Sequence, residues 1–466
     1  MPASTETEPT SADMPVDAAG IKVAFVTLGC AKNEVDTEKM RARVLAAGMQ
    51  LVNISQADCI VVNTCAFITE ATEEAIATIL DLANLAYTTG QQAKLVVTGC
   101  LPSRYQDELD TELPEVSAFV TVANEARIVE VILGLFGIKA QDARPSPDNE
   151  GSASINDKAT MPKMPMRVPE DNRPWAYLKI AEGCSRRCSF CTIPSIRGPY
   201  VSTSLAELTD EADQLVAGGA RELVLIAQDT GLWHDGEKDL ADLLEHLAKR
   251  FENVWIRLMY LQPSALSVRL LETMAAHPNI CRYLDIPLQH ASARVISDMG
   301  RSGDASEYLQ MIGQAREIMP DVALRTTVIA GFPGETRQES LELMRFIKAA
   351  KFDYVGVFVY SQEEGTVAGE RQDQVPMRTR RARAQRLRDL ADSIGFARAE
   401  ALIGKRLEVL VTGYEDGQVI GRSKAQAPEI DGVVRLATGE PGQLLVAEVV
   451  DTVCYDLEAV VISEPR

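Results

Sequence analysis

The stretch WAYLKIAEGCSRRCSFC (residues 175–191) joins a short apolar run to three closely spaced cysteines. The run has the length and composition of a buried β-strand. Cys184, Cys188 and Cys191 follow it in the pattern C-x3-C-x2-C. Three thiolates at this spacing can bind three irons of a cubane cluster and leave the fourth iron open to a small chelating ligand. The stretch therefore predicts an iron–sulfur site on a loop that follows a strand.

Two other uses of three neighbouring cysteines compete with a cluster, namely burial in a core and zinc binding. Structural zinc usually takes paired C-x2-C elements and a fourth protein ligand. No further Cys or His lies near residues 184–191 in the sequence to supply that ligand. The cluster interpretation is therefore the favoured one.

The predicted cluster loop belongs to a long series of alternating strand and helix patterns. Apolar runs occupy residues 175–181, 221–227, 254–261, 281–288, 322–330 and 352–360. Six strand–helix repeats predict an open, partial (β/α) barrel with its active residues on the loops after the strands. A long helix over residues 376–399 is expected to pack back onto this barrel.

A second, N-terminal series places three more cysteines at strand ends. Apolar runs at 21–28, 59–64 and 94–99 are each followed by a helical pattern, around 35–47, 67–83 and 103–109. Such alternation predicts a parallel sheet, whose ligands lie at the carboxyl ends of the strands. Cys30, Cys65 and Cys100 follow the three runs at a constant spacing of 35 residues, so we expect them to converge on a second cluster.

Each of these three cysteines could instead be a small core residue, which is the common fate of a free cysteine. For Cys59, Cys281 and Cys454, which lie in or beside apolar runs, that ordinary interpretation is preferred.

Five short runs from about Ile403 onward, separated by Gly, Asp and Pro, predict a small antiparallel β-barrel. The fold class is therefore α/β, with a terminal barrel. The expected organisation is a disordered tail (1–20), a parallel α/β domain (21–138), a linker (139–173), a partial barrel (174–400) and the terminal barrel (401–466).

Composition limits the function further. The formal net charge is −20 and only 5% of residues are aromatic, which disfavours a surface built for nucleic acid and favours a basic partner. The nine cysteines are an odd number in a chain without an export signal, so disulfides are not expected. We see no signal peptide and no membrane-spanning run, and we expect a cytoplasmic protein without membrane association.

Several motifs resemble those of the methylthiotransferase family of radical S-adenosylmethionine (SAM) enzymes. They are TLGCAKNEVDTE (27–38), VVNTCAF (61–67), TGCLPSRY (98–105) and GCSRRCSFCTIPSIRGPYVS (183–202). The terminal barrel is similar to the TRAM domain of that family. Within the family, GCAKN and DIPLQHAS (285–292) resemble the branch that modifies ribosomal protein S-twelve, because the tRNA-modifying branch typically reads GCQMN and PVQSGS.

The resemblance implies a reaction and its cofactors. One 4Fe-4S cluster, on Cys184, Cys188 and Cys191, cleaves SAM to a radical that removes a hydrogen from an unreactive carbon. A second 4Fe-4S cluster, on Cys30, Cys65 and Cys100, carries or donates sulfur, and a second SAM supplies the methyl group. The product is a methylthio group on the β-carbon of an aspartate of ribosomal protein S-twelve. No catalytic side chain is expected beyond the cluster ligands, and flavodoxin or ferredoxin is the expected electron donor.

Two alternatives remain open from the sequence. The first is a tRNA adenosine methylthiotransferase, although the acidic chain makes binding of free tRNA unexpected. The second is a non-catalytic iron–sulfur protein that binds ribosomes.

Other residues at strand ends are candidates for contacts with SAM or substrate. Gln228, Arg257, Gly331 and Glu335 are the expected SAM contacts, and Asp229, Gln289 and His290 are further candidates. An ordinary position on the rim of the barrel competes with each assignment. The arginine-rich run 376–388 predicts either a contact with ribosomal RNA or, preferably, a helix whose arginines pair with an acidic body.

Overall fold

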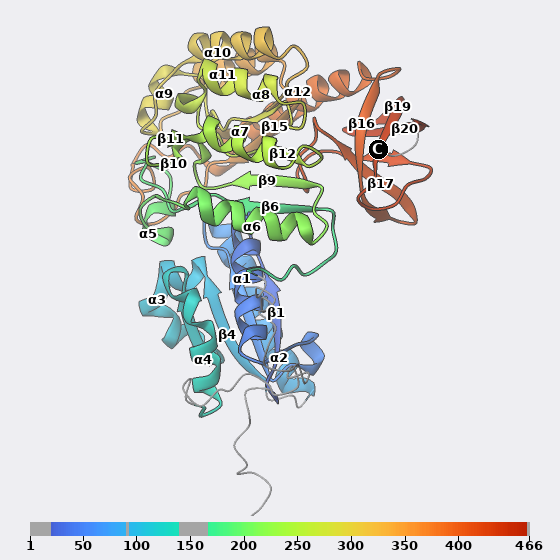
Figure 1. Cartoon of the computed structure of the whole chain (residues 1–466). Coiled ribbons are helices and arrows are strands. Elements are labelled where there is room, and N and C mark those ends of the chain that lie inside the picture. The colour runs from blue at the N-terminus through green and yellow to red at the C-terminus, as the bar shows by residue number, and fades with distance from the viewer. Residues whose placement is uncertain (1–19, 90–92, 139–165, 464–466) are drawn as a thin grey trace, which may run out of the picture. The chain divides into compact units, whose positions relative to one another are not determined.

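The computed structural model describes residues 20–89, 93–138 and 166–463. The chain divides into two compact units, residues 1–170 and 171–466, which are drawn in Figure 1. The predicted disordered tail and most of the predicted linker, residues 139–165, lie outside the described residues. Within the described ranges, no helix combines the length and the apolar character that a membrane crossing requires.

The first unit is built on a five-stranded parallel sheet. Its strands are β1 (Lys22–Thr27), β2 (Gln50–Leu51), β3 (Cys59–Thr64), β4 (Lys94–Gly99) and β5 (Ala118–Thr121), in the order β2-β1-β3-β4-β5. All of its paired strands run parallel. Strand β3 is buried along its whole length, as expected of a strand covered on both faces. The predicted parallel sheet is confirmed, and β2 and β5 are additional edge strands that the apolar pattern did not reveal.

Three α-helices connect these strands, namely α1 (Ala31–Ala46), α2 (Thr69–Thr89) and α3 (Cys100–Glu112), and a fourth, α4 (Ile128–Leu135), follows β5. Helices α1 and α3 begin earlier than the expected 35 and 103. The reason is that Cys30 is the N-cap residue of α1 and Cys100 is the first residue of α3. Two cysteines of this unit therefore lie directly at helix starts. The end of the predicted linker is ordered here, because Arg167 forms a buried ion pair with Glu38 on α1.

The second unit contains the predicted partial barrel. Its strands are β6 (Trp175–Lys179), β9 (Glu222–Ile226), β12 (Trp255–Leu258), β13 (Tyr283–Asp285), β14 (Ala323–Ala330) and β15 (Tyr354–Val359). They form two parallel sheets, β12-β9-β6 and β13-β14-β15. A bridge between Ile256 and Ile280 joins the first sheet to the segment before β13. All six predicted barrel strands are thus present.

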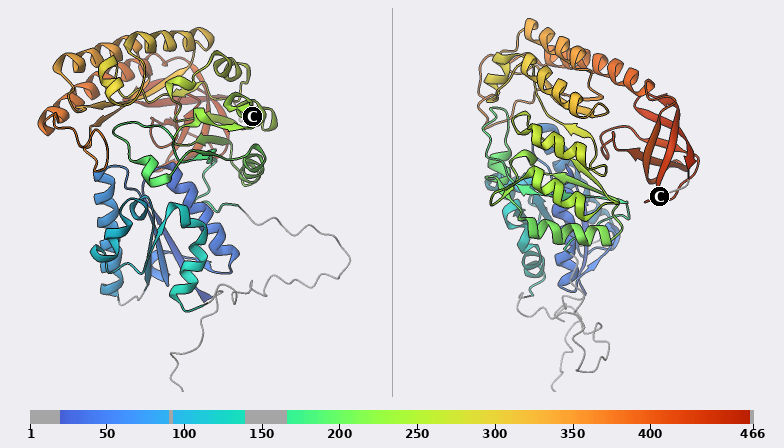
Figure 2. Two further views of the ribbon diagram at one scale, coloured as in Figure 1. Left: turned by 90° about the vertical axis from the view of Figure 1, so that its left-hand side faces the viewer. Right: turned by 45° about the horizontal axis from the view of Figure 1, so that its top comes forward.

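Helices cover the outside of this barrel. They include α6 (Leu205–Ala217), α7 (Leu240–Arg250), α8 (Val268–Ala276), α10 (Ala305–Ile318) and α11 (Arg337–Ala350). Capping boxes begin α6, α7 and α11, so these starts are encoded locally. The 24-residue helix α12 (Met377–Glu400) then packs on β15 and α11 and leads to the C-terminal barrel, as Figure 2 shows.

The terminal domain is a closed five-stranded barrel, with the strand order β16-β17-β18-β20-β19. Its strands are β16 (Arg406–Glu415), β17 (Gln418–Ser423), β18 (Val434–Leu436), β19 (Leu444–Val453) and β20 (Asp456–Ser463). The expectation of a purely antiparallel barrel is wrong at one seam, because β18 and β20 pair in parallel. The hairpin β19–β20 places β20 beside β18 with both strands running in the same direction. The barrel therefore closes through a parallel pair.

Buried charges fasten the terminal barrel to the partial barrel. Glu222 on β9 is fully buried and forms ion pairs with Arg257 on β12 and with Arg422 on β17. Arg257 also donates hydrogen bonds to the backbone carbonyls of Lys424 and Ser423. Burial alone would raise the pKa of Glu222, yet the two guanidinium groups lower it. One carboxylate therefore compensates two buried cations that belong to different domains.

This arrangement predicts a large loss of stability in Glu222→Gln. Removing the carboxylate leaves two buried guanidinium groups without a counter-charge, and breaking a buried pair in this way costs about 3–5 kcal/mol. Denaturant unfolding of the variant should show this loss in the transition of residues 171–466. The exposed Glu245→Gln, which breaks the surface pair with Lys249, is the control and should leave the midpoint unchanged. Equal midpoints for both variants would contradict the assignment.

Candidate cluster and cofactor sites

The predicted cluster loop extends from Cys184 to Cys191, at the end of β7 (Ala181–Glu182). All three cysteines are partly exposed and none forms a disulfide. The backbone N–H of Cys191 donates to the carbonyl of Cys188, and the N–H of Arg186 donates to the sulfur of Cys184 at 3.5 Å. Hydrogen bonds to sulfur of this kind tune an iron–sulfur cluster when it is bound. The loop thus has the conformation of a ligand-presenting segment rather than of a packed core.

Gly183 makes this loop possible. It has a φ of +74°, and a Cβ at this position would lie 2.2 Å from the carbonyl oxygen of Pro199. The N–H of Cys184 donates to the carbonyl of Gly198 directly beside it. A glycine is required here because the chain turns sharply against its neighbour in a conformation that side chains disfavour.

A second segment holds the other end of the loop. Ser189 donates through its backbone N–H to Met299 and through its hydroxyl to the carbonyl of Asp298, and its own carbonyl accepts from Ala368. Phe190 packs against the small apolar cluster that contains Met299 and Phe332. The aromatic residue before the last cysteine therefore anchors the loop, and the thiols remain at the surface of the barrel.

Burial raises the pKa of the Cys191 thiol to about 12 and raises that of Cys184. Thiols of this kind are protonated at neutral pH when no metal is bound, so a metal must displace their protons to bind. Among the described residues, no group of three Cys, His, Asp or Glu side chains is arranged around a single metal ion. The ligands of a cubane bind different irons, so a cluster does not need that arrangement, whereas a zinc ion does.

Three of the buried polar atoms without partners lie at the neighbouring strand ends. Oε1 of Gln228, Oε1 of Gln289 and Nε2 of His290 are buried and have no hydrogen-bond partner among the described residues. Such atoms are rare in a finished interior. They follow β9 and β13, on the edge to which parallel strands also deliver the cysteine loop. Atoms of this kind fit a polar cofactor such as SAM at this edge.

The tautomer of His290 follows from its surroundings. The backbone N–H of Ser292 donates to its Nδ1 at 3.0 Å, so the ring proton lies on Nε2. Burial lowers the pKa of His290 to about 4, so the ring is neutral at physiological pH. The Nε2–H group of His290 is therefore a buried donor that has no acceptor among the described residues.

Gln228 and Asp229 lie on either side of a charged network near the cysteine loop. Gln228 donates to Glu182 at 2.8 Å. Burial would raise the pKa of Glu182, but Lys179 and Arg197 lower it to about 2. Asp229 is fully buried and forms an ion pair with Arg186, a residue of the loop itself. Asp229 thus positions the cluster loop.

The turn after β14 is held by the carboxylate of Glu335. The side chain of Glu335 accepts hydrogen bonds from the backbone N–H groups of Gly331 and Phe332 and forms an ion pair with Arg383 at 3.1 Å. Burial raises the pKa of Glu335, and Arg383 opposes that shift. Glu335 therefore shapes the turn by occupying the backbone N–H groups of Gly331 and Phe332.

In the first unit, the three predicted cysteines follow three adjacent strands. Buried Asn33 and Asn63 bind each other's segments: Asn33 donates to the carbonyl of Thr64 and Asn63 donates to the carbonyl of Asn33, each at 2.8 Å. The sulfur of Cys30 lies 3.5 Å from Oδ1 of Asn33. A Cβ on Gly29, which has a φ of +100°, would lie 2.7 Å from the Cβ of Cys65. The Cys30 and Cys65 loops are therefore in close contact.

The Cys100 loop joins them through Thr64. Its hydroxyl donates to the carbonyl of Thr98 at 2.6 Å and accepts from the N–H of Leu101 at 3.3 Å. Arg104 also donates to the carbonyl of Ala66. The three loops are thus fixed to one another by side-chain hydrogen bonds at one edge of the sheet.

Three family models match successive parts of the chain. The description "Uncharacterized protein family UPF0004" matches residues 22–121, the "Radical SAM superfamily" matches 178–347 and the "TRAM domain" matches 403–462. The ribosomal protein uS12 methylthiotransferase RimO of Geobacter sulfurreducens is 42% identical over 95% of this chain and 99% of its own length. The RimO of Trichlorobacter lovleyi is 41% identical over 95% and 98%. The chain belongs to the RimO family.

Solved structures show the same fold at much lower identity. The radical SAM methyltransferase TsrM of Kitasatospora setae, in a structure with cobalamin and a [4Fe-4S] cluster bound, covers 75% of this chain with 17% identity and a TM-score of 0.55. The match to the radical SAM superfamily supports an iron–sulfur cluster and SAM as cofactors of this chain.

Arg257 has a different environment from the one predicted for a SAM contact. Its guanidinium group is fully buried and is bound to Glu222 and to the backbone of the terminal barrel. Arg257 lies within strand β12 and not on the loop that follows it, so its side chain does not reach the rim. We therefore assign Arg257 to the attachment of the TRAM domain and no longer to SAM.

Cys59 and Cys281 are buried core residues, and burial raises their pKa values to about 12 and about 11. Cys454 was expected in a core but is exposed in the turn between β19 and β20, with a φ of +58°. The apolar neighbours of Cys454 belong to the strands, and the cysteine itself occupies the turn that joins them.

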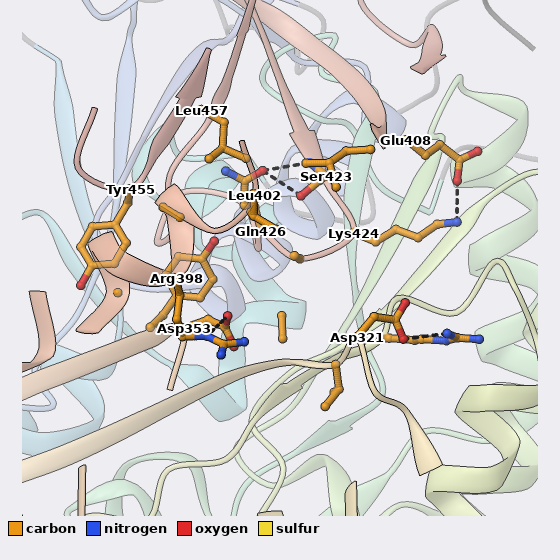
Figure 3. A pocket seen from close by; sticks show the side chains of 18 of the residues that line it. Asp321, Asp353, Arg398, Leu402, Glu408, Ser423, Lys424, Gln426, Tyr455 and Leu457 are labelled. Atoms are coloured by element: carbon orange, nitrogen blue, oxygen red, sulfur yellow. Dashed lines mark hydrogen bonds and ion pairs between the residues drawn. The ribbon is translucent and has the colours of Figure 1, made fainter. Parts of the chain in front are cut away.

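A cavity of about 470 Å³ lies at the amino ends of strands of the second unit, away from the cluster loop (Figure 3). Its lining includes Val322 and Asp353 at the amino ends of β14 and β15, with Leu407 and Lys424 of the TRAM barrel. Its charged groups are paired, as in Arg398 with Asp353 and Lys424 with Glu408. This cavity lies between the domains of the second unit at the edge opposite to the cluster loop, and no predicted site residue lines it.

Sequence reasoning missed several residues that shape these sites, among them Asn33, Asn63, Glu182 and Arg186. Asn33 and Asn63 stand in the quoted motifs, but only their contacts show that they join two cysteine loops. Glu182 precedes the cysteine loop and Arg186 lies within it, and a charge at such a position is the only local signal for them.

The neutral state of His290 predicts a pH effect on stability. Its folded pKa of about 4 lies below the ordinary value, so the unfolded chain binds more protons at mildly acidic pH. Stability should therefore fall as the pH drops from 7 to 5, by about 1–2 kcal/mol from this residue. Comparison of wild type with His290→Gln in denaturant unfolding isolates this contribution, because the variant should lose less stability over the same interval. Equal losses would show that His290 is not held neutral.

Proposed function

We infer that this RimO-family chain methylthiolates the β-carbon of an aspartate in ribosomal protein uS12, using SAM and iron–sulfur chemistry. The observation that carries the inference is the loop of Cys184, Cys188 and Cys191 at the strand edge where Gln228, Gln289 and His290 leave buried polar atoms without partners. Relatives named as uS12 methylthiotransferases match 95% of the chain.

The residues of the chain have distinct tasks in this reaction. The three cysteines of the loop would hold a cluster that supplies the electron for cleavage of the sulfonium C–S bond of SAM. The N–H of His290 and the free carbonyl of Gln228 would orient polar groups of SAM. The turn from Gly331 to Glu335 stays a proposed SAM contact on the same strand edge, and the Glu335 carboxylate fixes its shape by accepting from two of its N–H groups. Arg186, a residue of the loop, would hold the loop in place through its ion pair with buried Asp229.

We propose a second 4Fe-4S cluster on Cys30, Cys65 and Cys100. Support comes from the contacts that join their three loops through Asn33, Asn63 and Thr64. Separate sites for radical generation and for sulfur explain why the chain has two sets of three cysteines after parallel strands. Flavodoxin or ferredoxin remains our proposed electron donor.

The charge of the TRAM domain supports a protein substrate. Residues 403–466 contain six Lys and Arg against eleven Asp and Glu, a net charge of about −5. Barrels that bind tRNA need positive surfaces, because neutralisation of phosphates drives that affinity. An acidic barrel instead attracts a basic ribosomal protein and increases its rate of association.

The separate tasks proposed for the two clusters predict that substitutions in the two cysteine sets cause different losses of activity. Cys188→Ala should abolish reductive cleavage of SAM, measured as 5′-deoxyadenosine. Cys65→Ala should retain that cleavage and lose the methylthio product. Anaerobically reconstituted protein should bind about eight irons, and each variant about four, by the arithmetic of two cubanes. Buried Cys281→Ala serves as the matched control and should change neither iron nor product. Normal product from Cys65→Ala would refute the second cluster.

The substrate assignment predicts product on uS12 and none on tRNA. Both substrates are assayed with the same reconstituted enzyme at one ionic strength, and products are identified by mass spectrometry. Association with uS12 should weaken as salt rises, because it depends on opposite charges. Product on tRNA without product on the aspartate of uS12 would move the chain to the tRNA-modifying branch.

A further inference from the structure

Helices α11 and α12 carry an outward surface of positive charge that the acidic chain does not neutralise. We call this surface the basic face and define it by Arg337, Arg345 and Lys348 on α11 and by Arg378, Arg381 and Arg386 on α12. All six residues are exposed. In the described part of the chain, none of them has an ion pair among those found. The basic face is therefore available to a partner.

The other arginines of α12 face inward and have partners. Arg380 donates to the carbonyls of Val375 and Tyr360, Arg383 binds Glu335, and Arg388 donates to the carbonyl of Val357. Arg398 forms an ion pair with Asp353. The arginine-rich helix thus has two sets of arginines. Within the run 376–388, the expected pairing with a carboxylate is seen for Arg383, whereas Arg380 and Arg388 bind backbone carbonyls.

Helical geometry places the six cations on one side of a layer. Buried positions of α12 recur from Arg380 through Ala384 and Leu387 to Ala399, so at about 100° per residue Arg378 and Arg386 point away from the barrel and Arg381 lies on the flank. The same count on α11, whose buried positions include Leu343 and Ile347, places its own cations outward.

The two helices share this layer. Helix α11 packs against α12, and Figure 1 shows both at the same side of the partial barrel. Both helices start at the carboxyl edge of the strands, because Arg383 of α12 bonds the carbonyl of Glu335 just before α11 at 2.8 Å. The basic face therefore begins at the edge where the cluster loop and the unpartnered polar atoms lie.

The charge contrast limits the kind of partner. Helix α12 contains seven arginines and three acidic residues in a chain of net charge −20. Arginine presents a planar fork of donors that suits phosphate oxygens. A membrane surface would require a broad apolar stripe beside the cations, whereas large apolar side chains exposed on these helices are limited to Leu341 and Met377 among the described residues.

We propose that the basic face binds the phosphate backbone of ribosomal RNA next to the substrate protein. The proposal rests on the proposed function, since a ribosomal protein is presented on RNA. Six cations alone give weak, salt-sensitive binding. When the TRAM domain and the cluster site bind uS12 on the same particle, the neighbouring RNA is held at a high effective concentration near the basic face. The weak RNA contact then adds to the overall affinity. Free tRNA offers no such second contact and is held only weakly.

The test compares two forms of the substrate and isolated RNA. The variant Arg378→Gln/Arg381→Gln/Arg386→Gln keeps good helix formers at exposed positions. Its kcat/KM on uS12 within purified small ribosomal subunits should fall about tenfold or more, and that on isolated uS12 should stay within about twofold of wild type. For RNA extracted from those subunits, the slope of log Kd against log salt should decrease by about 2, because each phosphate contact contributes about 0.7–0.9.

Two control variants make the result specific. Lys238→Gln/Lys249→Gln/Arg250→Gln removes the same charge from exposed positions around α7 and should match wild type in every assay. Replacing the three α12 arginines by lysine keeps the charge and should restore most of the RNA binding. Equal salt slopes for wild type and the glutamine variant would overturn the proposal.

Other outcomes separate the two hypotheses. A lower rate on subunits with unchanged binding to RNA would overturn the RNA assignment in favour of an acidic protein. A lower salt slope for the variant, together with no product on either form of uS12 by wild type, would support the basic face and refute the proposed function instead.

Discussion

Both cysteine sites depend on one constraint, which is that a parallel strand delivers the loop that follows it to the carboxyl edge of its sheet. In the first unit this brings the loops of Cys30, Cys65 and Cys100 to adjacent strands β1, β3 and β4. In the second unit it brings the Cys184 loop to the same edge as Gln289 and His290. Hydrogen bonds of Asn33, Asn63 and Thr64 hold the loops of the first unit together, and glycines precede Cys30 and Cys184 because neighbouring chain leaves no room for a Cβ there.

Buried arginines join separate parts of the second unit. Glu222 compensates Arg257 and Arg422 across the two domains, and Arg380 satisfies backbone carbonyls at the turn before α12. Guanidinium groups suit this task because several fixed donors can bind several carbonyls at once. The cost is that each such group must keep every partner, since an unpaired buried charge destabilises the fold strongly. The TRAM domain is therefore held at a defined position on the partial barrel.

Much of this architecture could be predicted from the sequence because apolar runs of strand length mark buried parallel strands. The six runs of the partial barrel and the five of the terminal barrel all became strands. The same signal failed for β2 and β5, which are short edge strands with little apolar surface to bury. The parallel pair β18–β20 was not predictable from local pattern, because strand direction in a closed barrel depends on chain connectivity.

The site was predictable only as far as the chemistry is written in residue type and spacing. Spacing identifies a cysteine triplet, but it cannot tell whether an arginine such as Arg257 ends on a rim or inside a sheet. Nor can spacing reveal that His290 has one ring nitrogen satisfied and the other without a partner. Such facts depend on contacts between residues distant in sequence, for example Asp229 with Arg186.

Net charge is a poor guide to the surface of this protein, and the reason lies in how its arginines are used. A net charge of −20 suggests that every arginine has a carboxylate partner. Yet Arg380 and Arg388 are bound largely by backbone carbonyls, which carry no charge and neutralise nothing. Within the described ranges, the excess carboxylates of the TRAM domain therefore form no ion pairs with α12. The outward arginines of α12 likewise have no carboxylate partner among the described residues. An acidic surface and a basic one therefore coexist within the second unit. A substrate in which a basic protein lies against RNA is the kind of particle that can satisfy both at once.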